Sequence, residues 1–138
     1  MSHRIERVSP DDAEVARLEH ELRVFNEKAI GPYGFEPIAL VLRDPAGTVV
    51  GGFFGYTGLG WLNVSKLWVD EPLRGRGYGR ALMETGEAMG RERGCAHAFL
   101  FTFSFQAPDF YRALGYKEFA ALENFPIGAE RLFFRKEL

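Results

Sequence analysis

The feature that most constrains the fold of this 138-residue chain is a glycine-rich turn between an apolar strand and a helix. Residues 61–69 have the apolar character of a strand, and residues 79–93 have helical spacing with a glycine stop signal at Gly94. A further strand, expected over residues 95–105, follows the helix. A crossover helix between two neighbouring strands makes them parallel, because a hairpin would make them antiparallel. The sequence therefore predicts a mixed sheet with helices packed on it.

The turn itself has the composition of an anion-binding loop. Glycines allow backbone N–H groups to approach a ligand closely, and the N-terminus of the next helix adds free N–H groups and the positive end of its dipole. Arg74, Arg76 and Arg80 add positive charge. This combination predicts a cradle for a pyrophosphate group. A Walker A loop is excluded because the Gly-Lys-Ser/Thr ending is missing, and the dinucleotide fingerprint fits poorly because Arg80 stands at its third glycine.

Weaker patterns predict the rest of the chain. Alternation over residues 3–8 predicts a first strand, and Ser9 followed by Pro10 predicts the capped start of a helix. Phe99, Phe101, Phe103 and Phe105 alternate along their strand, which predicts one buried face. The other expected elements are strands at 38–43 and 48–56, joined by a turn, a short helix at 109–114, and strands at 116–123 and 131–135.

Composition and charge exclude several classes of function. The formal net charge is −2, from 17 basic and 19 acidic residues without a long run of either sign, so no nucleic-acid or membrane partner is expected. One cysteine, Cys95, and three scattered histidines predict neither a disulfide framework nor a metal site. The chain shows no secretory signal and no membrane-spanning apolar run. We therefore expect one cytoplasmic domain over residues 1–138.

Residues 74–79, Arg-Gly-Arg-Gly-Tyr-Gly, resemble the Arg/Gln-x-x-Gly-x-Gly/Ala motif of the GCN5-related N-acetyltransferase (GNAT) superfamily. The triplet Leu67-Trp68-Val69 precedes the motif, as an apolar-x-Val triplet does in that family, and residues 107–116 resemble its second signature, Ala-x-x-Phe-Tyr-x-x-x-Gly-Phe/Tyr. The resemblance covers essentially the whole chain. It implies a mixed α/β (α+β) fold of three layers, with a mostly antiparallel sheet of six to seven strands, splayed between strands 4 and 5, and helices on both faces.

The resemblance also implies an activity and a set of site residues. GNAT proteins transfer the acetyl group of acetyl-CoA directly to an amine. Tyr111 stands where the family often places a general acid, and Ser104 stands where many members carry an Asn that contacts the pantetheine arm. The residues that the resemblance assigns to cofactor binding are Leu67, Trp68, Val69, Arg74, Gly75, Arg76, Gly77, Tyr78, Gly79, Arg80 and Ser104.

The acceptor and the general base stay open in the sequence. A small-molecule primary amine is the expected acceptor, with a protein amine as the second choice, and a homodimer is expected through an edge strand at residues 131–135. Glu36, Asp70 and Glu71 are candidates for the base. The alternatives are a CoA-binding sensor or assembly module without transfer activity, and a nucleotide-binding protein that uses the same cradle.

Overall fold

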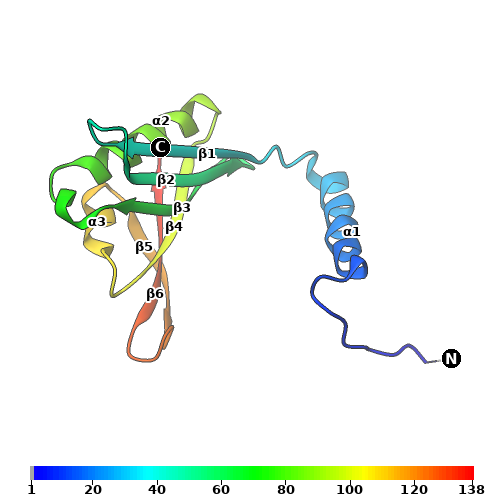
Figure 1. Ribbon diagram of the computed structural model, residues 1–138. Coiled ribbons are helices and arrows are strands. Elements are labelled where there is room, and N and C mark those ends of the chain that lie inside the picture. Colours follow the sequence, from blue (N-terminus) through cyan, green and yellow to red (C-terminus); the bar gives the residue numbers. More distant parts are fainter. Residues whose placement is uncertain (1) are drawn as a thin grey trace. The chain divides into compact units, whose positions relative to one another are not determined.

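The computed structural model describes residues 2–138 and separates them into two compact units, with the division after Tyr33 (Figure 1). The first unit carries helix α1 (Ala13–Ile30), and the second, Gly34–Leu138, carries the sheet and the other helices. Among residues 2–138, no helix is long and apolar enough to cross a membrane. The expectation of a single domain over residues 1–138 stays a prediction.

Helix α1 begins later than the sequence predicted. Its N-cap is Asp12, whose carboxylate accepts a 2.9 Å hydrogen bond from the N–H of Glu14. Ser9 instead opens the preceding turn, where its carbonyl accepts from the N–H of Asp12. The predicted strand over residues 3–8 is also wrong, because this exposed segment is not in regular structure. Its alternation is weak and it buries no apolar side chain, so little would offset the entropy of ordering it.

The second unit is built on a six-stranded sheet in the order β1-β2-β3-β4-β6-β5. Neighbouring strands are antiparallel except β3 and β4, which are parallel. This confirms the mixed sheet that the crossover predicted. The strands are β1 (Glu36–Arg43), β2 (Val49–Gly58), β3 (Trp61–Val69), β4 (His97–Phe103), β5 (Lys117–Glu123) and β6 (Glu130–Glu137). The helical elements of this unit are the 3-10 turn η1 (Glu71–Leu73), α2 (Tyr78–Glu92) and α3 (Pro108–Ala113).

Helix α2 makes the crossover from β3 to β4 and covers one face of β1, β2 and β3. Its buried residues include Leu82 and Met83, which join the core formed by the sheet. Gly86 lets the helix approach closely, because a Cβ there would lie 2.6 Å from the Phe53 ring. The position of α2 is therefore fixed by packing along its length, and its N-terminus is held at the end of β3.

The phenylalanine alternation of β4 does not form the buried face that the sequence predicted. Ala98, Leu100 and Thr102 are the buried residues of this strand, whereas Phe101 is 42% exposed on the opposite face. Small and aliphatic side chains fit the core beneath α2, and the bulky rings occupy the other face. Alternation shows that a strand has two faces, but it does not show which face the helix will cover.

The C-terminal strand is not an edge of the sheet. β6 lies between β4 and β5, so the edges are β1 and β5, and the predicted edge at residues 131–135 is wrong. Strand β5 carries Lys117, Glu118 and Glu123, and charges of this kind discourage edge-to-edge pairing. The homodimer stays a prediction, which sedimentation at high protein concentration would test.

Candidate active site

The site begins where β3 and β4 separate. The two strands pair only over residues 61–63 and 97–99, after which both continue without further pairing to each other. A register shift opposite Phe54 and Gly55 makes Ser65 an extra residue, and such a bulge bends a strand. The β3 peptide groups that face β4 beyond residue 63 thus lack a ladder partner. This separation is the splay that the sequence resemblance implied between strands 4 and 5. Those strands are β3 and β4 here, because residues 3–8 do not form the expected first strand.

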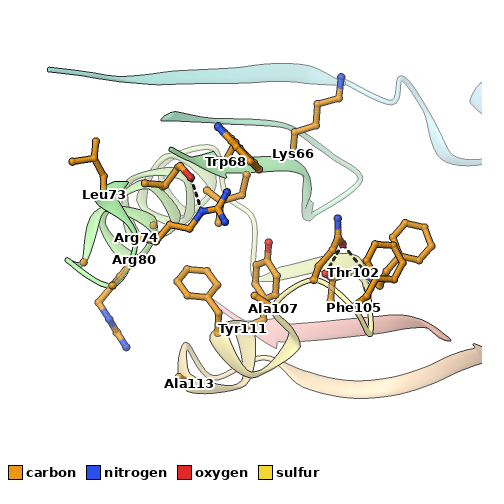
Figure 2. A pocket seen from close by; sticks show the side chains of 18 of the residues that line it. Lys66, Trp68, Leu73, Arg74, Arg80, Thr102, Phe105, Ala107, Tyr111 and Ala113 are labelled. Carbon is orange, nitrogen blue, oxygen red and sulfur yellow. Dashed lines mark hydrogen bonds between the residues drawn. The ribbon is translucent and has the colours of Figure 1, made fainter. Parts of the chain in front are cut away.

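The separation opens into a cleft of about 850 Å³. In Figure 2, Trp68 and Arg74 lie on one side of it, and Ala107 and Tyr111 lie on the other. The cleft therefore runs from the strand gap to the turn before α2. The predicted site residues that line it are Leu67, Trp68, Val69, Arg74, Gly75, Gly77, Gly79, Arg80 and Tyr111. Those that lie outside the lining are Arg76, Tyr78 and Ser104.

The turn before α2 is shaped to receive an anion. Gly75 and Gly77 have φ values of 77° and 89°, and a Cβ at either position would meet no atom within 4 Å. Gly77 is the N-cap of α2, which has neither a side-chain cap nor an acidic residue in its first turn. The first N–H groups of the helix therefore have no side-chain cap as an acceptor. This geometry fits a diphosphate group, as the sequence predicted.

Arg74 is held in place by two contacts. Its Nε donates to the carbonyl oxygen of Val69 at 2.8 Å, and its guanidinium carbon lies 4.5 Å from the centre of the Trp68 ring. The Trp68 indole N–H in turn donates to Asp70 at 3.0 Å. Since a guanidinium has five N–H donors, this arrangement leaves others to bind an anion.

Tyr111 lies on α3 with its ring packed between apolar neighbours. Ring contacts join it to Phe110, Tyr116 and Phe134, with centroid distances from 5.1 to 6.4 Å. Its hydroxyl group points toward β3 across the cleft (Figure 2). Burial raises the pKa of Tyr111 above its ordinary value, because an apolar environment disfavours the phenolate. The residue is therefore protonated at neutral pH.

Ser104 is occupied elsewhere, and Gln106 lines the cleft instead. The Ser104 hydroxyl accepts from the N–H of Glu130 at 2.9 Å, which joins the end of β4 to the start of β6. The Gln106 side-chain oxygen accepts from the Thr102 hydroxyl at 2.8 Å and from the Phe103 N–H at 2.9 Å. These bonds fix the amide so that its NH₂ group is the remaining polar end. Sequence reasoning missed Gln106 because it followed the position of the family's Asn rather than the fold of the loop.

Comparison with known proteins agrees with this geometry. Residues 36–118 match the family model described as the acetyltransferase (GNAT) domain. The chain belongs to the GNAT acetyltransferase family. Blasticidin-S acetyltransferase from Streptomyces morookaense is 40% identical over 93 residues, which are 67% of this chain and 68% of that protein. Acetyltransferase Atu2258 from Agrobacterium fabrum is 30% identical over 112 residues, or 80% and 82% of the two chains.

A solved structure extends the comparison. The crystal structure of an acetyltransferase from Bacillus cereus is 32% identical, with a TM-score of 0.92, and covers 99% of this chain and 98% of the other. The GNAT-like fold expected from the sequence is thereby confirmed, and so is the assignment as an enzyme of the acetyltransferase class. Acetyltransferases of the GNAT family use acetyl-CoA.

Within this GNAT acetyltransferase, the candidate bases do not reach the cleft. The lining described for residues 2–138 contains neither acidic residues nor histidine. The Glu36 carboxylate lies 3.7 Å from Arg93, and the Asp70 carboxylate accepts from Trp68. Glu71 belongs to the turn η1, outside the lining. None of these three carboxylates therefore lines the described cleft.

Proposed function

We propose that this chain transfers the acetyl group of acetyl-CoA to a primary amine of a small molecule, without an acyl-enzyme intermediate. The observation that carries the proposal is the continuity of one cleft. It joins the gap between β3 and β4, the open turn at Gly75 and Gly77, and the hydroxyl of Tyr111. An elongated thioester with a diphosphate at one end matches this order of features.

Each part of the cleft has a role in binding the acetyl-CoA substrate. The turn and the first N–H groups of α2 bind the pyrophosphate, together with the guanidinium of Arg74. The unpaired peptide groups of β3, over residues 64–69, bind the amide groups of the pantetheine arm in the way that an added strand would. The NH₂ group of Gln106 is a further donor from the β4 side. These contacts place the thioester in the strand gap.

The reaction then needs little further machinery. The neutral amine attacks the thioester carbonyl, a C–N bond forms, and a peptide N–H of β3 stabilises the resulting oxyanion. The C–S bond breaks as the tetrahedral species collapses, and the leaving thiolate takes a proton from the Tyr111 hydroxyl. The proton lost by the amine passes to water, from which Tyr111 is reprotonated. The products are the acetylated amine and free CoA.

Two observations favour a small-molecule acceptor. The relative from Streptomyces morookaense is named for the small molecule blasticidin S. The β4 side of the cleft is lined by Phe101, Phe103 and Phe105, which form an aromatic surface instead of the acidic surface that a basic peptide would favour. The acceptor therefore has an apolar or aromatic body.

Thiol release from acetyl-CoA in the presence of a panel of small primary amines tests the activity. Thermal unfolding tests the binding step separately, since ligand at about 100 times its dissociation constant adds roughly 2.7 kcal/mol to the free energy of unfolding. We expect stabilisation by acetyl-CoA and CoA, and release that depends on the amine. Stabilisation by CoA with no release in any amine would instead indicate a binding module. Stabilisation by NAD or ATP alone would indicate a nucleotide site.

A further inference from the structure

Arg131 lies within a group of phenylalanine rings at one wall of the cleft. Its guanidinium carbon is 3.5 Å from the ring centre of Phe101, 5.0 Å from that of Phe125 and 5.6 Å from that of Phe133. The strand register places Arg131 directly opposite Phe103 of β4. The guanidinium therefore packs against Phe101 and Phe103, two rings that line the cleft.

The guanidinium has no anionic partner in the part of the chain that the structure describes. Its Nε is buried, and residues 2–138 provide it with no hydrogen-bond acceptor. The neighbouring cations of the fold differ in this respect, because Lys136 pairs with Glu87 at 3.0 Å and Arg112 pairs with Glu118 at 2.8 Å. Aromatic rings stabilise a cation through their faces, but they do not satisfy N–H donors that lie in the guanidinium plane.

A buried and unsatisfied donor is costly to a fold, and an anion bound to the terminal N–H groups of the same guanidinium would offset its unpaired charge. We propose that Arg131 binds a carboxylate group of the acceptor, so that the substrate is an amine that also carries a carboxylate. The inference rests on the proposed transferase function and specifies its acceptor. A carboxylate matches the guanidinium through two parallel hydrogen bonds, and the surrounding rings exclude water from that pair.

This arrangement selects and orients the acceptor. The carboxylate is held at β6, and the body of the molecule lies along Phe101 and Phe103, so that the amine is directed toward the strand gap. Acceptors that carry only positive charge are disfavoured by the guanidinium. Arg131 is thus a specificity-determining residue, distinct from the residues that bind acetyl-CoA.

The test uses two matched pairs of acceptors: 4-(aminomethyl)benzoate with 4-(aminomethyl)benzamide, and 6-aminohexanoate with 6-aminohexanamide. In the wild-type protein we expect kcat/KM to favour the carboxylate of at least one pair by about 10- to 100-fold, the usual range for a charge-assisted hydrogen-bonded pair. Arg131→Met should remove this preference and leave the amide rate nearly unchanged. Arg131→Lys, which keeps the charge without the planar fork, should retain part of it.

Arg135→Gln is the matched control. Arg135 lies on the same strand and the same face, with its guanidinium 5.1 Å from the Trp61 ring, and the β4 residue opposite it, Phe99, does not line the cleft. This variant should keep the full preference for the carboxylate. Melting temperatures of all variants show whether they fold, and Arg131→Met is expected to fold well because it replaces an unsatisfied cation by an apolar side chain among rings.

A binding measurement separates this inference from the proposed function. The dissociation constants of 4-methylbenzoate and 4-methylbenzamide, which contain no amine, are measured by NMR titration in the wild type and in Arg131→Met. Tighter binding of the benzoate that is lost in the variant supports the carboxylate site even if no amine is acetylated. Equal binding of the two probes, or equal rates for both members of each acceptor pair in the wild type, overturns it. In that case Arg131 serves only to pack the phenylalanine rings.

Discussion

At the scale of single residues, burial gives Tyr111 the protonation state that its proposed role requires. An exposed tyrosine has a pKa of about 10, and the apolar neighbours of Tyr111 raise its pKa further. The thiol of CoA resembles a cysteine thiol, with a pKa of about 8.5. The tyrosine therefore stays protonated at the pH where a thiolate leaves, and it can donate without the help of a second acid.

Replacing Tyr111 by Phe should lower turnover by roughly 10²- to 10⁴-fold, the usual contribution of one general acid. The ring contacts with Phe110 and Phe134 remain, so the fold and the affinity for acetyl-CoA should change little. Thiol release measures the rate, and calorimetric titration with CoA measures the affinity. If turnover is unchanged, water is the proton donor. If CoA binding is lost while turnover at saturation persists, the hydroxyl is a binding contact.

Gly77 allows the anion-binding turn to be tested against a control of equal strain. Gly77 and Gly47 both have a φ of 89°, and a Cβ would meet no atom within 4 Å at either. A valine at each position should lower the free energy of unfolding by a similar amount, roughly 1–2 kcal/mol, because L-residues avoid this conformation. Gly47 lies in the turn between β1 and β2 and does not line the cleft.

Acetyl-CoA binding should therefore be lost in Gly77→Val and retained in Gly47→Val. Urea unfolding gives the stability of the two variants, and titration with CoA gives their affinities. Near-normal affinity in a folded Gly77→Val protein would contradict the assignment of this turn to the pyrophosphate. Equal loss of affinity in both variants would show that strain alone, rather than the location, causes it.

At the scale of elements, a buried ionic contact ties α2 to the far side of the sheet. Glu87 is 3% exposed and accepts a 2.7 Å hydrogen bond from the Tyr116 hydroxyl as well as the contact from Lys136. Burial, followed by the hydrogen bond to Glu87, raises the pKa of Tyr116 far above its ordinary value. The carboxylate is thus satisfied by a residue of β6 and by the residue before β5, and these contacts hold α2 at Glu87.

Lys136→Met should destabilise the fold by about 3 kcal/mol, because removing one partner leaves a buried charge uncompensated. Glu84→Gln is the comparison on the same helix, since Glu84 is exposed and its contact with Arg80 spans 3.5 Å. That variant should change stability by less than about 0.5 kcal/mol. Urea unfolding measures both. If both variants lose a similarly small part of the free energy of unfolding, solvent reaches Glu87 and screens its charge.

At the scale of the whole molecule, the absence of acidic side chains from the described cleft lining predicts the pH dependence. The amine must arrive neutral, so kcat/KM should rise about tenfold per pH unit below the pKa of the acceptor amine and then level off. It should fall only above about pH 10, since the pKa of Tyr111 is raised. Measured with several amines, the midpoint should follow the pKa of each acceptor. A midpoint fixed near neutral pH for every acceptor would reveal a side-chain base.

The local parts of this molecule were predictable from sequence. Strand β3 occupies residues 61–69 as predicted, and α2 begins at Tyr78, one residue before its predicted start, because glycines mark both boundaries. The open glycine turn before α2 was predictable for the same reason, since one continuous segment forms it, and its role in binding an anion stays a prediction. Short-range chemistry of turns and caps determines such features.

Features that depend on how elements distant in sequence pack against one another were not predictable. The buried face of β4 depends on where α2 packs, and the interior position of β6 depends on the path of the whole C-terminal region. Gln106 and Arg131 acquire their surroundings from the loop after β4 and from the pairing of β4 with β6. Neither residue belongs to a local motif, so spacing along the chain carries no signal for them.

The separation of β3 from β4 also has a consequence for hydrogen exchange. A strand in the middle of a sheet normally protects its amides, yet the N–H groups of residues 64–69 that face the gap have no strand beside them. In the free protein these amides should exchange with deuterium almost as fast as those of an open loop, while alternate amides bonded to β2 remain protected. Acetyl-CoA should slow the fast class selectively. NMR measures the exchange of each amide. If all β3 amides are equally protected in the ligand-free protein, the gap is closed in solution.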